Sequence, residues 1–186
     1  SGCDALLVET SQDLLQVKAA INGCRQAIGE TDRDIVLIAQ VTVETTGTML
    51  LGSEIGAALN TLEPMGIDLI GLNCATGPTE MSEHLRYLSK NAKVAISVMP
   101  NAGLPVLGAN GASYPLGPNE LALALEGFVD DYGISLVGGC CGTTPEHLTA
   151  VVNKVSGKAI AKRNPELDPG ASSLYQYVPF RQDKTY

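Results

Sequence analysis

The chain has 186 residues, of which 45% are hydrophobic, and its 12 basic and 20 acidic residues give a formal net charge of −8. This length and composition fit one domain with a sizeable buried core, and the absence of a basic cluster argues against nucleic acid as a partner. No stretch reaches the roughly 18 to 20 apolar residues of a membrane span, and no basic segment leads into an apolar one as in a signal peptide, so we expect a soluble, cytoplasmic protein without membrane contact.

Short apolar runs alternate along the chain with segments of helical spacing. The runs are mostly rich in β-branched residues and nearly continuous, which is typical of parallel strands buried on both faces. The predicted strands and helices follow one another as strand 5–8, helix 14–28, strand 35–43, helix 54–62, strand 67–72, helix 81–88, strand 94–98, helix 121–128, strand 134–137 and helix 148–155. A strand-helix unit is thus repeated five times.

Helix start signals support this register. They are Ser11 ahead of Gln12-Asp13, Pro78 after Gly77, Pro118 after Gly117, and Thr144-Pro145-Glu146. Repeated strand-helix units favour an α/β fold, either a (βα)8 TIM-type barrel or an open doubly wound sheet. No G-x-G-x-x-G motif follows the first strand, which weakens a dinucleotide-binding version of the open sheet.

A closed barrel needs eight strand-helix units and about 250 residues. The five units present would be its C-terminal part, without the first three strands. Unpaired strand edges recruit other strands, so an isolated fragment is expected to self-associate. We therefore expect the chain to be part of a larger protein.

The last segment departs from the strand-helix pattern. We expect residues 1–158 to form the partial barrel and residues 159–186 to be a linker, around 164–170, followed by an aromatic tail. The tail either lies on a neighbouring surface or packs back on this domain. Its aromatic residues are Tyr175, Tyr177, Phe180 and Tyr186.

Five cysteines without a secretory signal indicate reduced thiols rather than a disulfide framework. Cys3 and Cys24 stand alone beside apolar neighbours, and we expect them to be buried structural thiols. Cys74 follows the third strand, and Cys140-Cys141 follow the fifth. The carboxyl ends of parallel strands meet at one edge of a barrel, where active sites are built, so we expect these three thiols to lie together.

Adjacent cysteines on an ideal strand point to opposite faces. Gly138, Gly139 and Gly142 give the backbone the freedom to turn both thiols toward one ion. A buried apolar pair or a redox couple is the alternative, although redox pairs normally use C-x-x-C spacing.

Three thiolates suit zinc, and a fourth position left free is typical of a catalytic site. The chain's two histidines, His84 and His147, lie in helical segments, on a helix surface and in a first turn, so we expect neither to be a ligand. The sequence therefore predicts an open zinc-thiolate site.

Two cysteine signatures resemble those of the homocysteine methyltransferase family in wording and order. They are Gly71-Leu72-Asn73-Cys74-Ala75-Thr76-Gly77-Pro78 and Gly138-Gly139-Cys140-Cys141-Gly142-Thr143-Thr144-Pro145-Glu146-His147, supported by Val8-Glu9-Thr10, Pro100-Asn101-Ala102-Gly103 and Tyr114-Pro115-Leu116. The resemblance covers nearly the whole chain. The family's opening segment, which contributes an acidic residue to the substrate pocket, has no counterpart here.

The resemblance implies a zinc ion held by Cys74, Cys140 and Cys141, with the thiol of L-homocysteine at the open position. The zinc ion itself lowers the pKa of the substrate thiol, while the net charge of −1 that three thiolates leave on the site keeps its sulfur electron-rich. The sulfur would take an activated methyl group and give methionine, with no catalytic residue beyond the zinc site.

The resemblance also assigns substrate contacts. Glu9 matches the residue that holds the ammonium group of the substrate, and Asn101 matches a polar position near the site. From helix-end electrostatics, we expect the substrate carboxylate to bind backbone N–H groups around Thr76-Gly77.

The tail bears on the methyl donor. Tyr175-Gln176-Tyr177-Val178-Pro179-Phe180-Arg181-Gln182-Asp183 resembles the connector that leads, in cobalamin-dependent members of the family, from the homocysteine barrel into a folate barrel. This favours methylcobalamin carried on another domain, with folate and cobalamin domains as partners in the same full-length chain.

Other functions stay open from the sequence. They are a betaine- or S-methylmethionine-dependent homocysteine methyltransferase, a non-catalytic zinc-thiolate module, and a barrel enzyme of unrelated chemistry. For an unrelated barrel enzyme, Glu44 is the best candidate for a catalytic residue at a strand end. A carboxylate in a loop is the simpler interpretation of Glu44.

Overall fold

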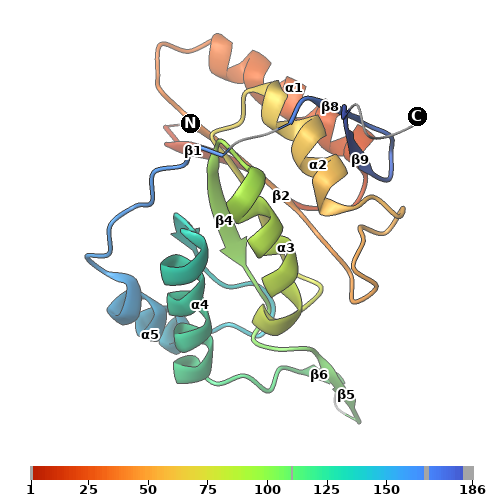
Figure 1. Cartoon of the computed structure of the whole chain (residues 1–186). Coiled ribbons are helices and arrows are strands. Elements are labelled where there is room, and N and C mark those ends of the chain that lie inside the picture. The colour runs from red at the N-terminus through yellow and green to blue at the C-terminus, as the bar shows by residue number, and fades with distance from the viewer. Residues whose placement is uncertain (1, 110, 166–167, 182–186) are drawn as a thin grey trace.

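A parallel five-stranded sheet forms the centre of the computed structural model, which describes residues 2–109, 111–165 and 168–181 (Figure 1). All four strand pairings are parallel, and the strand order is β1-β2-β3-β4-β7. The strands are β1 (Ala5–Ser11), β2 (Val36–Val41), β3 (Leu69–Asn73), β4 (Ala95–Met99) and β7 (Leu136–Val137). The α/β class and the parallel sheet predicted from the sequence are confirmed.

A helix follows each of these strands. The helices are α1 (Leu14–Gly29), α2 (Ile55–Leu62), α3 (Pro78–Asn91), α4 (Pro118–Tyr132) and α5 (Pro145–Val155). Because the strand order never reverses and crossovers between parallel strands are right-handed, the connecting helices α1 to α4 lie on one face of the sheet, and α5 packs against α4. Consecutive helices also contact one another from α1 to α5, and Figure 1 shows α3 beside α4.

The apolar core lies between this helical layer and the sheet. Fully buried side chains come from both layers, for example Ile21 of α1, Leu85 of α3, Ile70 of β3 and Ile96 of β4. The continuous apolar character of the strands reflects this burial, since every residue of β2 from Leu37 to Val41 is buried.

Prolines set the first turn of three helices, as predicted. In α3 and α4 the residue before the proline is glycine, and its backbone N–H donates to a glutamate three residues on, Glu80 at 3.1 Å and Glu120 at 2.8 Å. The prediction for α1 was wrong, because Ser11 belongs to β1 and the N-cap is Asp13, whose carboxylate accepts from Leu15 N.

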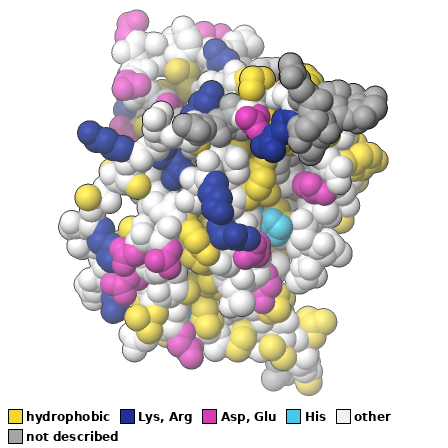
Figure 2. Space-filling view, in the orientation of Figure 1, with side chains coloured by type: hydrophobic (Ala, Val, Ile, Leu, Met, Phe, Trp, Pro, Cys, Tyr) yellow, Lys and Arg dark blue, Asp and Glu magenta, His cyan; other side chains and the backbone are white. Residues whose placement is uncertain are grey.

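Two hairpins and a short 3-10 helix, η1 (Glu63–Met65), were not foreseen. The β5 (Val106–Gly108) and β6 (Gly111–Ser113) hairpin follows β4 and projects from the body at the lower edge of Figures 1 and 2. Its strands are three residues long, which is too short for periodicity to reveal.

The second hairpin, β8 (Gly170–Ser172) and β9 (Tyr177–Pro179), belongs to the aromatic tail and packs on α2. Between its strands, Tyr175 O accepts from Glu54 N, and Gln176 donates to the Glu54 carboxylate. The described part of the tail thus packs back on this domain. Within the predicted linker and tail, Glu166, Leu167 and residues 182–186, with Tyr186, lie outside the described residues.

Among the helices in residues 2–109, 111–165 and 168–181, none combines the length and the apolar character that crossing a membrane requires.

Candidate functional site

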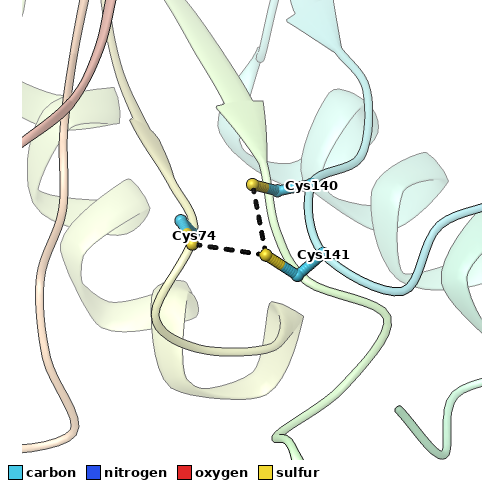
Figure 3. Close-up of side chains that lie close together, drawn as sticks. All are labelled: Cys74, Cys140 and Cys141. Carbon is cyan, nitrogen blue, oxygen red and sulfur yellow. Dashed lines mark hydrogen bonds between the residues drawn. The ribbon is translucent and has the colours of Figure 1, made fainter. Parts of the chain in front are cut away.

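Three thiols converge at the carboxyl edge of the sheet (Figure 3). Cys74 follows β3 directly, and Cys140 and Cys141 follow β7 after two glycines. Cys141 Sγ lies 3.7 Å from Cys74 Sγ and 4.0 Å from Cys140 Sγ. All three sulfurs fall within 4.8 Å of one another, and in the described part of the chain they are the one group of three or more potential Cys, His, Asp or Glu ligands. The predicted convergence is confirmed.

The paired cysteines sit in a tight turn. Thr143 N donates to Cys140 O at 3.2 Å, which closes a four-residue turn. Its third residue, Gly142, has φ +78, the left-handed value that a type II turn requires there. A Cβ on Gly142 would also lie 2.3 Å from Cγ of Tyr114. Of the three glycines invoked from the sequence, Gly142 is the one with a positive φ.

The turn at Cys74 has no glycine at its two strained positions. Cys74 and Ala75 have φ +62 and +59, values that non-glycine residues rarely adopt. Thr76 N donates to Cys74 O at 2.7 Å, and Cys74 N donates to Met99 O at 3.2 Å. Such backbone strain is concentrated at functional sites.

Asn101 connects the two cysteine turns. Its side-chain Oδ1 accepts from Cys141 N at 3.0 Å, and its own N–H donates to Thr76 O at 3.0 Å. The residue is 2% exposed. Asn101 therefore lies at the site and supports the backbone that carries Cys141.

Glu9 reaches the cluster through Asn73. Asn73 Nδ2 donates to Glu9 Oε2 at 3.4 Å and also lies 3.9 Å from Cys140 Sγ. Glu9 is at the end of β1 and exposed, while Asn73 is fully buried. Sequence reasoning assigned no role to Asn73. The available signal was its place at a strand end, immediately before a ligand cysteine.

Thr76 and Gly77 lie next to Cys74, but their N–H groups already have partners. Thr76 N donates to Cys74 O, and Gly77 N donates to Glu80 Oε2. A substrate carboxylate would have to replace these acceptors, and its binding here stays a prediction.

The thiols and a tyrosine affect one another's ionisation. Burial raises the pKa of Cys140 to about 12, and the neighbouring thiols of Cys74 and Cys141 add to the rise. A hydrogen bond with Cys141 raises the pKa of Tyr114, whose ring packs on Gly142. Tyr114 is a second residue of the site to which sequence reasoning gave no role.

The residues set aside from the site lie elsewhere. His84 is half-buried on α3, and burial lowers its pKa. His147 is in the first turn of α5, where its ring contacts Thr144 N and Leu116 O. The carboxylate of Glu44 lies in the loop after β2 and accepts from Gln12.

The two remaining cysteines differ from each other. The prediction that Cys3 is buried was wrong, because Cys3 is exposed ahead of the first strand. Cys24 is partly buried and packs against the core, as expected for a structural thiol.

Three sulfurs on two facing turns could hold one metal ion. Thiolate ligands suit Zn²⁺ and other soft or borderline ions, and three protein ligands leave a tetrahedral ion one position for a further group. The donor set and the spacing of the sulfurs therefore fit a metal ion that can also bind a thiol from solution.

The chain resembles known proteins in sequence. The family model for homocysteine S-methyltransferase matches residues 1–155. The chain is 63% identical to a methionine synthase of Mycobacterium tuberculosis over 182 residues and 61% identical to one of Mycobacterium leprae over 186 residues. These alignments include 98% and 97% of the chain but 15% of each relative, so the chain spans a small part of their length.

The fold also has a counterpart among solved structures. The apo form of the homocysteine methyltransferase MmuM from Escherichia coli matches with a TM-score of 0.64 at 20% identity, covering 82% of this chain and 50% of that one. Its oxidized form matches with the same TM-score and identity, and 46% of that chain is covered. At this level of identity the likeness concerns the fold.

Proposed function

Because the chain belongs to the homocysteine S-methyltransferase family, we propose that it binds L-homocysteine and activates its thiol on zinc for methyl transfer to give methionine. The observation that carries the proposal is the convergence of three cysteine sulfurs at the carboxyl edge of the sheet. Cys74, Cys140 and Cys141 would hold the ion. When bound, zinc supplies a Lewis-acid site that keeps a substrate thiol deprotonated at neutral pH.

The protein's own residues orient the substrate around that site. Glu9 is an exposed carboxylate at the same edge, within hydrogen-bonding distance of Asn73, and it would receive the ammonium group. Asn101 would keep Cys141 in place through its bond to Cys141 N. Because Asn101 is almost fully buried, its contribution to substrate binding is made through the backbone that it supports.

The substrate carboxylate would bind near the start of α3. The N–H of Thr76 is engaged in a three-residue turn with Cys74 O, which is a less favourable bond than a helical or sheet one. A substrate carboxylate that replaced this partner would lie near the positive end of α3. Gly77 keeps Glu80 as its partner unless that side chain turns away.

The fold proposal is a (βα)8 barrel of which residues 1–158 supply about five C-terminal units. Within the described residues, β1 and β7 each have one neighbour in the sheet, so each presents a free edge. Preceding strands of a longer chain would pair there and close the barrel. A fragment without them would instead self-associate through the same edges.

The methyl donor is proposed to be methylcobalamin on another domain of the same chain. The support is the resemblance of residues 175–183 to a connector toward a folate domain, and the small share of the curated relatives that the chain spans. Residues 159–186 would then be the linker to that domain. Betaine and S-methylmethionine are the alternative donors, and the reaction is assigned to the cytoplasm because the site needs reduced thiols.

Zinc content and X-ray absorption at the zinc edge test this proposal. In the full-length protein we expect about one zinc per chain, with three sulfur ligands that become four when L-homocysteine is added. Cys141→Ala should lower the metal content strongly, while Cys24→Ala, a cysteine outside the site, should leave it unchanged. Zinc whose sulfur count ignores homocysteine would support a non-catalytic zinc-thiolate module instead.

A further inference from the structure

Asn73 makes side-chain contacts with both sides of the candidate site. It is the last residue of β3 and is fully buried. Its backbone carbonyl accepts from Thr42 Oγ1 at 3.1 Å, which ties the end of β3 to the end of β2. With the backbone fixed in this way, the carboxamide has a defined direction toward β1 and the Cys140 turn.

The first set of contacts holds the end of β1. Asn73 Oδ1 accepts from Thr10 N at 2.8 Å, and Asn73 Nδ2 donates to Thr10 Oγ1 at 2.8 Å. Thr10 has φ +55, an unfavourable conformation for a β-branched residue. The register between β1 and β2 is irregular at this point. The two bonds therefore stabilise a backbone kink that places Glu9 at the site.

The second set of contacts comes from the same amide nitrogen. Asn73 Nδ2 lies 3.4 Å from Glu9 Oε2 and 3.9 Å from Cys140 Sγ. An amide nitrogen carries two hydrogens, so these are shared among Thr10, Glu9 and Cys140. An ionised aspartate at position 73 would keep an acceptor for Thr10 N, but it would have no donor for the carboxylate or the sulfur.

We propose that Asn73 is a positioning residue that links the amine-binding side of the site to the metal-binding side. It orients the Glu9 carboxylate toward the substrate ammonium group, and it donates an N–H to the Cys140 sulfur. A hydrogen bond to a thiolate withdraws charge from the sulfur, so Asn73 also limits how much charge Cys140 gives to a bound metal. This inference rests on the proposed function for the identity of the substrate.

The test uses the full-length protein prepared without corrinoid and loaded with Co²⁺ in place of zinc, because thiolate-to-cobalt charge-transfer bands report on the sulfur ligands. Asn73→Asp should move these bands to lower energy, since the sulfur loses its hydrogen-bond donor. Asn60→Asp, the same change at a half-buried asparagine on α2 that contacts Ser172, is the matched control and should leave the bands in place.

Ligand binding to the Co²⁺ protein tests the other side of the link. L-homocysteine is compared with 4-mercaptobutanoate, which has the same thiol and carboxylate but no amine. We expect Asn73→Asp to raise the Kd of L-homocysteine about tenfold and that of 4-mercaptobutanoate about twofold or less, because the amine-binding carboxylate alone is displaced and repelled. The proposal is overturned if Asn73→Asp weakens the binding of both ligands equally and leaves the charge-transfer bands in place. Asn73 would then be a structural residue.

A second pair of variants separates the proposed role of Asn73 from its contribution to folding. Asn73→Ala removes every side-chain bond and is expected to destabilise the Thr10 kink. Adding Thr10→Gly relieves the left-handed strain and should restore folding, but not the position of the charge-transfer bands or the preference for the amine. Restoration of both by Thr10→Gly would overturn the role of the Cys140 and Glu9 contacts.

The two proposals fail in different ways. A wild-type protein that shows thiolate bands but does not respond to L-homocysteine would contradict the proposed function. In that case the band shift in Asn73→Asp still decides whether Asn73 acts on Cys140.

Discussion

The two turns that bring the cysteines together are built in different ways. The turn after β7, Cys140 to Thr143, has a glycine at its left-handed position, with φ +78 at Gly142. The turn after β3 places Cys74 and Ala75 at φ +62 and +59 without a glycine. The first conformation is available to the local sequence, whereas the second has to be imposed by the surroundings.

The surroundings of the β3 turn supply the missing stabilisation. Cys74 N donates to the β4 residue Met99, and Thr76 O accepts from Asn101 N. Residues held in such conformations cost free energy, and they persist where contacts with neighbouring structure fix the backbone. One ligand pair, Cys140 and Cys141, is therefore encoded locally, and the third ligand, Cys74, is positioned by the tertiary fold.

The largest expected effect comes from removing the glycine of the β7 turn. Gly142→Ala should lower the free energy of unfolding by about 3 kcal/mol, from the left-handed backbone and from the 2.3 Å approach of the new Cβ to Tyr114. The metal affinity of the variant should fall together with its stability. Denaturant unfolding measures the stability, and metal titration measures the affinity.

The matched control is Gly157→Ala. Gly157 has φ +80, but a Cβ there would meet nothing within 4 Å, so the expected loss is about 1 kcal/mol. Equal losses at the two positions would show that the Tyr114 contact does not constrain the cysteine turn.

The protonation of Cys140 gives the next effect. Because burial holds the pKa of Cys140 near 12, its thiol is protonated at neutral pH, and metal binding must expel that proton. Metal affinity should therefore rise about tenfold per pH unit for each proton expelled, or about 100-fold from pH 6 to 8 for Cys140 alone. Isothermal titration in buffers of different ionisation enthalpy measures the proton release.

The same raised pKa predicts the pH dependence of the metal-free protein. The protonated thiol of Cys140 is favoured in the folded protein, and the stability linked to it is fully present below the ordinary thiol pKa of 9.0. This stability is lost as pH rises toward about 12. Cys24→Ser serves as the control and should leave both pH profiles unchanged. A metal affinity independent of pH would mean that the cysteines of the site are already ionised.

The smallest effect should have the opposite sign. Ala75→Gly relieves a left-handed alanine in the β3 turn, so we expect the free energy of unfolding to rise by about 0.5–1 kcal/mol. Ala19→Gly on the exposed face of α1 should lower it by about 1 kcal/mol. If the two variants lose the same stability, the β3 turn is not strained and the contrast between the turns fails.

Much of the fold could be predicted because its signals are local. Apolar runs and helical spacing predicted the α/β class and the parallel sheet, and Pro78, Pro118 and Pro145 marked where three of the helices begin. The hairpins β5–β6 and β8–β9 escaped prediction because strands of three residues have no readable period. Ser11 was mistaken for a cap because β1 runs three residues further than its apolar run.

The order of strands and helices along the chain is enough to place Cys74, Cys140 and Cys141 at one edge, because parallel strands point their carboxyl ends the same way. No sequence pattern indicates that Asn73 lies between Glu9 and Cys140, or that the N–H groups of Thr76 and Gly77 are already engaged; both follow from the folded structure. The physical reason is range. Turn and strand signals act between near neighbours, whereas Asn73 meets residues 64 and 67 positions away, whose approach depends on the register and twist of the whole sheet.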